Sequence, residues 1–315
     1  MKKLIIENTY RSLLIYMLYD YSWKGRDYIL VKGRISDEFI SRFKAKVNSV
    51  SITDDFPIIS IKSPLSSILT RLKFLKKIKQ YEEIYGNVYE LKLRKCDSKL
   101  IQLDDGLMTK KMFEGEYNRK ITHIKFRNNF IFRRFLNVDY NFKPNSFMFV
   151  VPDSYKNNKQ LSCDFINLRT KINNLSNDEY LNICEVYGFS PVKLNGKSIL
   201  MLQPFFEDRL VSSIEYEINM YKEILKSEGL LESDIYIKPH PKSKVNYAKH
   251  FKCSEFIPKD FPYELLVRNS AENRFKKVIS INSSGIEEFK DISEEVINFG
   301  TSNFTELDFS PMIRL

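Results

Sequence analysis

The chain of 315 residues is 43% hydrophobic and 14% aromatic, which allows a large buried core, and its length favours two domains. Four cysteines lie far apart without a Cys-x-x-Cys pair and only three histidines occur, so the sequence excludes a disulfide framework and argues against a zinc or histidine-rich metal centre. The formal net charge of +10 predicts an anionic partner: nucleic acid, an acidic membrane surface, or a phosphorylated or carboxylated ligand.

The amino terminus and the apolar runs predict neither a leader peptide nor a membrane span. The apolar run after the first two lysines is interrupted by Glu7 and Asn8, which makes it too short for a signal peptide. The next cluster ends at Asp20, and no stretch of about eighteen uncharged apolar residues follows. We therefore expect a cytoplasmic protein.

The first fifty residues alternate between strand and helix patterns. Thr9 and Ser36 stand at capping positions, and Phe39 and Phe43 recur at helical spacing behind the second cap. The predicted elements are strand 3–6, helix 10–21, strand 27–31 and helix 36–46. A β-α-β-α order is typical of a parallel, doubly wound sheet.

A basic amphipathic helix is predicted from Ser63-Pro64 onward. Its apolar stripe is formed by Leu65, Ile68, Leu69, Leu72, Leu75 and Ile78. Its opposite face carries Arg71, Lys73, Lys76, Lys77 and Lys79. Such a helix can lie on an anionic bilayer. The alternative, which we favour at this point, is a domain helix whose lysines are merely solvated.

Two strands are predicted next, at 87–93 and 99–103, and the second ends in Asp104-Asp105-Gly106. Aromatic and basic residues then interleave over residues 119–135. This run could stack bases and neutralise phosphates, seat a helix among lipid headgroups, or form two core strands with charged outer faces. The last interpretation is our default.

The second half repeats the strand and helix alternation. Residues 157–178 are rich in Asn, Lys and Ser, so we place an interdomain region from there to about residue 197 and predict domains at 1–190 and 191–315. The predicted elements are strand 198–202, which ends in Gln203-Pro204, helix 208–226, strand 234–238, helix 263–268, strand 277–281 and strand 295–299.

Polar residues follow three of these predicted strands. Strand 234–238 delivers His240 in Lys238-Pro239-His240-Pro241, and Ser283-Ser284-Gly285 follows strand 277–281. In open α/β sheets ligands bind beyond the carboxyl ends of strands, so two facing halves would place Asp104-Asp105 opposite His240. A carboxylate base and an imidazole acid suit group transfer between a hydroxyl and a nucleotide, with a phosphate at the serines.

Three of these motifs resemble the signatures of bacterial sialyltransferases: Asp-Asp-Gly, Lys-Pro-His-Pro and Ser-Ser. Their spacing is most similar to glycosyltransferase family 52, as are Gln203-Pro204 and the segment 262–266. The resemblance implies a GT-B fold, an α/β protein with two facing Rossmann-like domains, parallel sheets and a cleft between them. The implied reaction is inverting and uses CMP-sialic acid as donor, with no cofactor and no metal ion.

The resemblance also implies roles for individual residues. Asp105 would be the general base, with Asp104 as second candidate, and His240 would protonate or hydrogen-bond the leaving CMP phosphate. Ser283 and Ser284 would bind that phosphate, and Glu264 would hold the ribose hydroxyls. The remaining candidates for substrate contact are Thr9, Gly106, Gln203, Lys238 and Pro241.

The implied partners are the nucleotide-sugar donor and a glycan acceptor, a terminal galactose of a capsule or lipooligosaccharide. Under this hypothesis the basic faces hold the enzyme against the inner, anionic leaflet of the membrane. A homodimer is left open. Two alternatives are kept: a CDP-glycerol-type glycerophosphate transferase of teichoic acid synthesis, which also uses a His-Pro and a serine-rich phosphate site, and a basic nucleic-acid-binding protein. No recognisable nucleic-acid motif accompanies the charge, so we expect no nucleic-acid partner.

Overall fold

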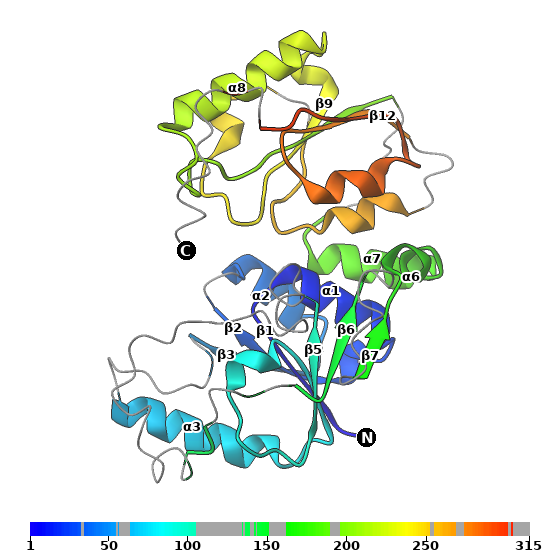
Figure 1. The fold of residues 1–315 in the computed structure, drawn as a ribbon. Coiled ribbons are helices and arrows are strands. Elements are labelled where there is room, and N and C mark those ends of the chain that lie inside the picture. The colour runs from blue at the N-terminus through cyan, green and yellow to red at the C-terminus, as the bar shows by residue number, and fades with distance from the viewer. Residues whose placement is uncertain are drawn as a thin grey trace. The chain divides into compact units, whose positions relative to one another are not determined.

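A computed structural model (Figure 1) describes residues 1–32, 35–54, 56, 64–104, 134, 136–138, 142, 144–150, 162–189, 196–252, 255–268, 274–301 and 304. The chain divides into two compact units, Met1–Asn174 and Leu175–Leu315. The division falls earlier than the boundary after residue 190 that composition suggested. Within the described part of the chain, no helix is long and apolar enough to cross a membrane.

The first unit is built on a parallel sheet with strand order β3-β2-β1-β4-β5-β6-β7. The strands are β1 (Lys3–Glu7), β2 (Asp27–Val31), β3 (Ser49–Thr53), β4 (Glu83–Gly86), β5 (Lys99–Leu103), β6 (Ser146–Phe149) and β7 (Ser162–Phe165). Leu4, Ile5 and Ile6 of β1 are fully buried, as expected of a central strand covered on both faces.

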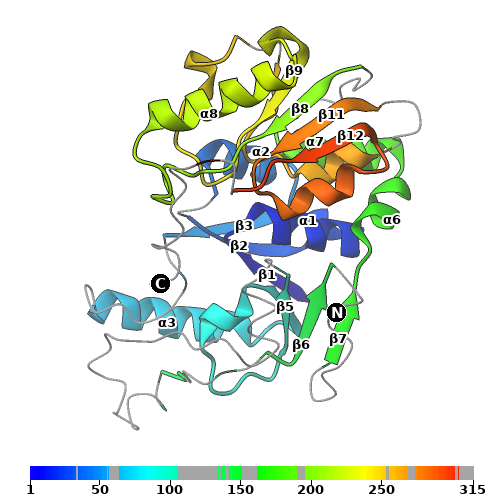
Figure 2. The same ribbon diagram turned by 45° about the horizontal axis from the view of Figure 1, so that its top comes forward.

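Helices cover both faces of this sheet. They are α1 (Tyr10–Tyr19), α2 (Asp37–Lys44), α3 (Pro64–Ile78) and α6 (Leu168–Asn173), with 3-10 turns η1 (Trp23–Gly25) and η2 (Val88–Leu91). The Tyr28 ring of β2 contacts Tyr16 of α1 and Phe43 of α2, whereas the next residue, Ile29, joins the core cluster that contains Phe74 of α3. Because successive side chains of a strand point to opposite faces, α3 lies on the face opposite to α1 and α2, as Figures 1 and 2 show.

The second unit has a smaller parallel sheet with the order β10-β9-β8-β11-β12. Its strands are β8 (Ser198–Met201), β9 (Ile235–Lys238), β10 (Glu255–Phe256), β11 (Phe275–Ser280) and β12 (Ser293–Asn298). Its helices are α7 (Asn177–Val186) and α8 (Ile214–Ser227), with η3 (Glu232–Asp234), η4 (Tyr247–Lys249), η5 (Tyr263–Val267) and η6 (Ser284–Phe289). Helix α8 packs on one sheet face through Ile218 and Tyr221, and Phe289 of η6 contacts Phe275 on the other.

Both sheets share one topology. Counted within each unit, the first five strands lie in the order 3-2-1-4-5, so the strand order reverses between β1 and β4 and between β8 and β11. This is the Rossmann order, in which the crevice beyond the carboxyl ends at the reversal receives the ligand. The prediction of an α/β protein with two Rossmann-like parallel sheets is confirmed.

Several local predictions were wrong. Residues 87–93 do not form a strand: β4 ends at Gly86, and η2 follows it. The supposed interdomain region contains β7, α6 and α7, and α7 is tied to the second unit because the Tyr180 hydroxyl donates to the Leu265 carbonyl (3.0 Å). Helix α8 begins at Ile214, where the Ser213 side chain caps it. The run at 119–135 lies outside the described residues except for Arg134.

Two residues of α3 were assigned to the wrong face. Arg71, expected on the basic surface, is fully buried, and its guanidinium donates to four backbone carbonyls, those of Leu91, Lys92, Leu136 and Asn137 (2.7–3.4 Å). Leu69, expected in the apolar stripe, is 60% exposed. The buried face therefore runs through Arg71, Phe74 and Ile78, and the sheet-facing stripe is rotated from the one the pattern predicted.

Candidate functional site

Three candidate residues follow three adjacent strands of the second unit. Lys238 of β9, Met201 of β8 and Ser280 of β11 lie in register. His240 stands two residues after Lys238, Gln203 two residues after Met201, and Ser283 three residues after Ser280. Adjacent strands are about 4.8 Å apart, so these residues leave the same edge within about 10 Å of sheet width. The site therefore lies at the point where the strand order reverses.

His240 is half-buried directly after β9. Its Nδ1 accepts a hydrogen bond from the backbone N–H of Lys242 (3.2 Å), so in the neutral ring the proton is on Nε2. Burial lowers the pKa of His240, and the positive charges of Lys238 and Lys242 lower it further. The negative charges of Asp208 and Glu207 act in the opposite direction and raise it. At pH 7 the imidazole is therefore mainly neutral and offers Nε2–H as a donor.

A polar network fixes the loop that carries His240. Glu207 accepts hydrogen bonds from the Ser243 hydroxyl (2.8 Å) and from the backbone N–H of Lys244, and the Tyr247 hydroxyl donates to Glu217. Burial would raise the pKa of Glu207, but the hydrogen bonds from Lys244 and Ser243 lower it. Burial raises the pKa of Glu217. The loops after β8 and β9 are thus held together by carboxylates, which fixes the backbone beside His240.

Lys238 is a buried strut under the same turn. Its Nζ donates to the carbonyls of Pro239 and Lys259, both at 2.9 Å. Burial lowers the pKa of Lys238 to about 7, although the negative charges of Glu264 and Asp260 act to raise it. Glu264 is 2% exposed. Lys238 was predicted to contact the substrate, but its ammonium donates hydrogen bonds to backbone carbonyls. The ribose contact predicted for Glu264 stays a prediction.

The serine motif forms a tight junction with η5. Ser283 is half-buried and stands at the start of η6, but its side chain makes no capping hydrogen bond. A Cβ on Gly285 would lie 2.6 Å from Cζ of Tyr263, whose ring also contacts Phe289 (5.7 Å between centroids). The glycine therefore lets the Tyr263 ring lie against the backbone that follows Ser283 and Ser284.

In the first unit, Asp104 directly follows β5 and is 4% exposed. Its Oδ2 accepts from the backbone N–H of Val150 (3.3 Å) and lies 3.7 Å from an Arg11 nitrogen, while its carbonyl accepts from the Ser12 hydroxyl (3.1 Å). These contacts tie the end of β5 to α1 and β6. Asp105 and Gly106 lie outside the described residues.

Thr9 lies at the reversal between β1 and β4. Its hydroxyl donates to the Ser12 hydroxyl (3.0 Å), which links it to Asp104. Glu7, at the carboxyl end of β1, is fully buried, and Gly86 has a φ of +120° where a Cβ would lie 2.8 Å from the Ile6 carbonyl carbon. Sequence reasoning missed Glu7, which it treated only as the end of an apolar run, although an acid at the end of a central strand was the available signal.

The loop anchors Glu207 and Glu217 were also missed, because they belong to a loop and a helix remote from His240 in sequence. Pro241 is exposed, and the Gln203 backbone N–H donates to the Tyr221 hydroxyl (2.7 Å).

Over the residues that the structure describes, no group of three or more His, Cys, Asp or Glu side chains could hold a metal ion. The prediction of a metal-free reaction stays a prediction.

Two Rossmann-type units, one with a histidine and a serine at the carboxyl ends of neighbouring strands, are typical of enzymes that bind nucleotide-linked substrates. Residues 40–293 match the family model described as alpha-2,8-polysialyltransferase (POLYST). The chain belongs to the alpha-2,8-polysialyltransferase family. The predicted relation to sialyltransferases is confirmed at this level, whereas the assignment to glycosyltransferase family 52 stays a prediction.

Two further similarities accompany the family match. The chain is 29% identical over 155 residues to an uncharacterized protein of Haemophilus influenzae (strain ATCC 51907 / DSM 11121 / KW20 / Rd), which covers 48% of this chain and 47% of that protein. The matched segment thus spans about half the length of this relative. The structure of UDP-GlcNAc 2-epimerase from Methanocaldococcus jannaschii superimposes with a TM-score of 0.43 at 8% identity, over 95% of this chain and 89% of that one.

Proposed function

We propose that the protein is an inverting, metal-independent sialyltransferase that moves sialic acid from CMP-sialic acid to the end of a bacterial surface glycan, such as a capsule or lipooligosaccharide. The observation that supports this most is the family match over residues 40–293, which includes both the β9–His240 segment and the β11–Ser283 segment. Those two segments bring a histidine and a serine to one sheet edge, where a phosphate would be bound.

His240 has the form needed to assist the leaving group. In this proposal the bond between the sialic acid anomeric carbon and the phosphate oxygen breaks, and CMP leaves with one additional negative charge. The Nε2–H of a neutral His240 donates to that oxygen, and the hydrogen bond strengthens as charge develops. Ser283 and Ser284 would bind the other phosphate oxygens, since the Ser283 side chain is not used to cap η6.

The general base is assigned to Asp105. It would take the proton of the acceptor hydroxyl as that oxygen attacks the anomeric carbon. Asp104 is less suited because its carboxylate already accepts from Val150 and lies beside Arg11. Asp104 and Thr9 would then position the loop that carries Asp105 and Gly106.

Two kinds of acceptor are compatible with this reaction. The sequence resemblance favoured a terminal galactose, whereas the family's description names an α-2,8 linkage and so favours a terminal sialic acid. An assay with one acceptor of each kind distinguishes them. The predicted cytoplasmic location and a homodimer also stay predictions.

The test measures CMP release from CMP-sialic acid by the purified full chain, with and without acceptor and with chelator. We expect release that requires an acceptor and is unaffected by chelator. His240→Gln should lower turnover by about 10²–10⁴-fold. His250→Gln is the matched control, because it makes the same change outside the proposed site, and it should retain turnover.

Consumption of CDP-glycerol in place of CMP-sialic acid would overturn the proposal and favour the glycerophosphate transferase. Full activity of both Asp105→Asn and His240→Gln would overturn the assigned roles even if sialic acid is transferred. Asp105→Asn compared with Asp104→Asn then tests which aspartate is the base.

A further inference from the structure

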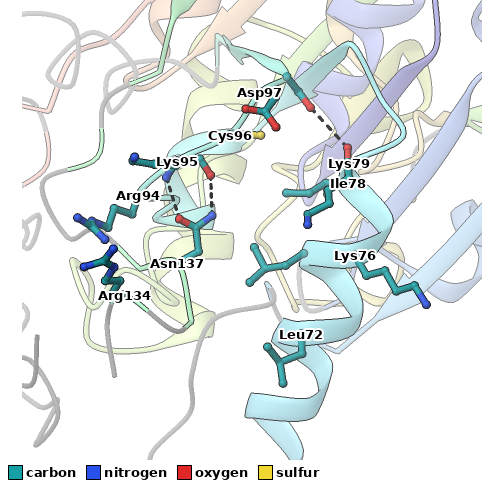
Figure 3. A pocket seen from close by; sticks show the side chains of 12 residues that line it. Leu72, Lys76, Ile78, Lys79, Arg94, Lys95, Cys96, Asp97, Arg134 and Asn137 are labelled. Atoms are coloured by element: carbon teal, nitrogen blue, oxygen red, sulfur yellow. Dashed lines mark hydrogen bonds between the residues drawn. The ribbon is translucent and has the colours of Figure 1, made fainter. Parts of the chain in front are cut away.

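A pocket of about 640 Å³ lies in the first unit, away from the candidate residues Thr9 and Asp104 (Figure 3). One side is the last part of α3, which leads into β4, and the other is the segment 94–98, which leads into β5. The pocket is therefore at the amino-terminal edge of the sheet. Asp104 stands at the opposite edge, one length of β5 away, which is about 17 Å for five residues.

The wall of this pocket is fixed by polar contacts. The Asn137 side chain accepts from the backbone N–H of Lys95 (2.8 Å) and donates to the Lys95 carbonyl (2.6 Å), as Figure 3 shows. Buried Arg71 donates to the Leu91 and Asn137 carbonyls (2.7 and 2.9 Å) from beneath. The Ser98 hydroxyl closes the junction between α3 and β5 by donating to the Tyr81 carbonyl (2.6 Å). These contacts fix the backbone segments that carry the lining side chains, half of which are themselves exposed.

The lining combines basic and apolar side chains. Five of the twelve lining residues are basic: Lys76, Lys79, Arg94, Lys95 and Arg134. Asp97 is the acidic member, and Leu72, Leu75 and Ile78 supply the apolar part. A ligand that satisfies both parts carries negative charge next to apolar groups.

The exposed surface of α3 also combines basic and apolar side chains beyond the pocket. Positions 69, 72, 76 and 79 recur at spacings of three and four, so they share one helix face. Leu69, one turn before the pocket, is 60% exposed. An exposed leucine beside lysines gains nothing from a soluble polyanion, but it gains free energy on entering the headgroup region of a bilayer.

We propose that this pocket binds the phosphate headgroup of an anionic phospholipid and that α3 lies on the membrane surface when it does so. The predicted contact with an anionic leaflet is thereby assigned to α3 and this pocket. Asp104, at the opposite end of β5, does not line this pocket. This lipid binding does not depend on the reaction that the protein performs.

The experiment measures co-sedimentation of the full-length protein with vesicles of equimolar phosphatidylglycerol and phosphatidylcholine, without donor or acceptor. Each basic residue at an anionic surface contributes about fivefold in affinity, so Lys76→Gln/Lys79→Gln should weaken binding by about 30-fold. The matched control is Lys44→Gln/Lys226→Gln, which removes the same charge from exposed positions on α2 and α8, away from α3, and should change binding by less than about threefold.

Other results would overturn the proposal. Equal losses in the two double variants would show that net charge, and not the pocket, drives binding. Displacement of the vesicles by millimolar sn-glycerol 3-phosphate would assign the pocket to a soluble phosphate. Binding of single-stranded RNA that is lost in Lys76→Gln/Lys79→Gln, together with no binding to vesicles, would assign it to a polyanion. Sialyl transfer to a soluble acceptor, measured in parallel, reports separately on the proposed function.

Discussion

The buried Lys238 predicts an unusual dependence of stability on pH. Methionine at this position keeps the length of the side chain but removes the charge and the two hydrogen bonds to the Pro239 and Lys259 carbonyls. Loss of those bonds costs about 1 kcal/mol each at any pH. The charge acts differently, because the pKa of Lys238 falls from 10.5 to about 7 on burial. At pH 7 this costs the native protein about 4 kcal/mol relative to strongly alkaline solution.

The sign follows from proton binding. Between pH 7 and 10.5 the unfolded chain holds a proton on Lys238 that the native state has released, so the stability of the wild type rises with pH in this window. Lys238→Met lacks this gain. The stability of the variant relative to wild type should therefore fall by about 2 kcal/mol from pH 7 to pH 9.

Urea unfolding followed by circular dichroism at both pH values measures this difference. Lys44→Met, at an exposed position, is the control and should show the same difference from wild type at both. A stability difference between Lys238→Met and wild type that does not change with pH would refute the reasoning, because Lys238 would then titrate as an ordinary lysine.

Three further predictions rest on named contacts. Gly285→Ala should destabilise the protein by about 1–3 kcal/mol in urea unfolding, because the new methyl group overlaps the Tyr263 ring, and Tyr263→Ala in the same chain should relieve part of that cost. Arg71→Met should destabilise by about 3–5 kcal/mol, because it leaves four carbonyl contacts unmet, three of them buried. The pH profile of turnover should rise through a pKa below 6.5 as His240 becomes neutral, and His240→Gln should abolish that limb.

Each of these has an outcome that contradicts it. Normal stability of Gly285→Ala would mean that Tyr263 moves aside without cost. If Arg71→Met unfolds no more easily than Lys73→Met, the guanidinium is not a structural strut. A limb that survives in His240→Gln belongs to another group.

The parts of the fold that the sequence predicted are those in which strand and helix patterns are unambiguous. Strands β1, β2, β8 and β9 are short apolar runs that end at polar or turn residues, so their positions could be predicted to within a residue. Strand β3 was missed because its Ser49–Thr53 segment alternates serines with Val50 and Ile52. It lies at the sheet edge, where all five residues are only half-buried, and its apolar signal is correspondingly weak.

One physical cause of the wrong predictions is that polar side chains took part in burial. Periodicity placed Arg71 on the surface because arginine is normally solvated, but backbone carbonyls surround its guanidinium and satisfy its donors. Val88 and Leu91 suggested a strand, yet Gly86 turns the chain beforehand and they pack as a 3-10 turn. For the candidate site, sequence placed His240, Gln203 and Ser283 at strand ends, but it could not show that Lys238 is committed to backbone carbonyls.

The parallel pairing of both sheets has a consequence for how the chain is made. Two neighbouring parallel strands cannot be joined by a tight hairpin, so each pair can form only after the crossover segment between the two strands has been synthesised. Strand β1 leaves the ribosome before β4, one of its two partners, whose residues Glu83–Gly86 are synthesised much later. Until then the fully apolar Leu4-Ile5-Ile6 segment has an open edge. The edge of β1 is therefore exposed to aggregation in the nascent chain until β4 has been synthesised.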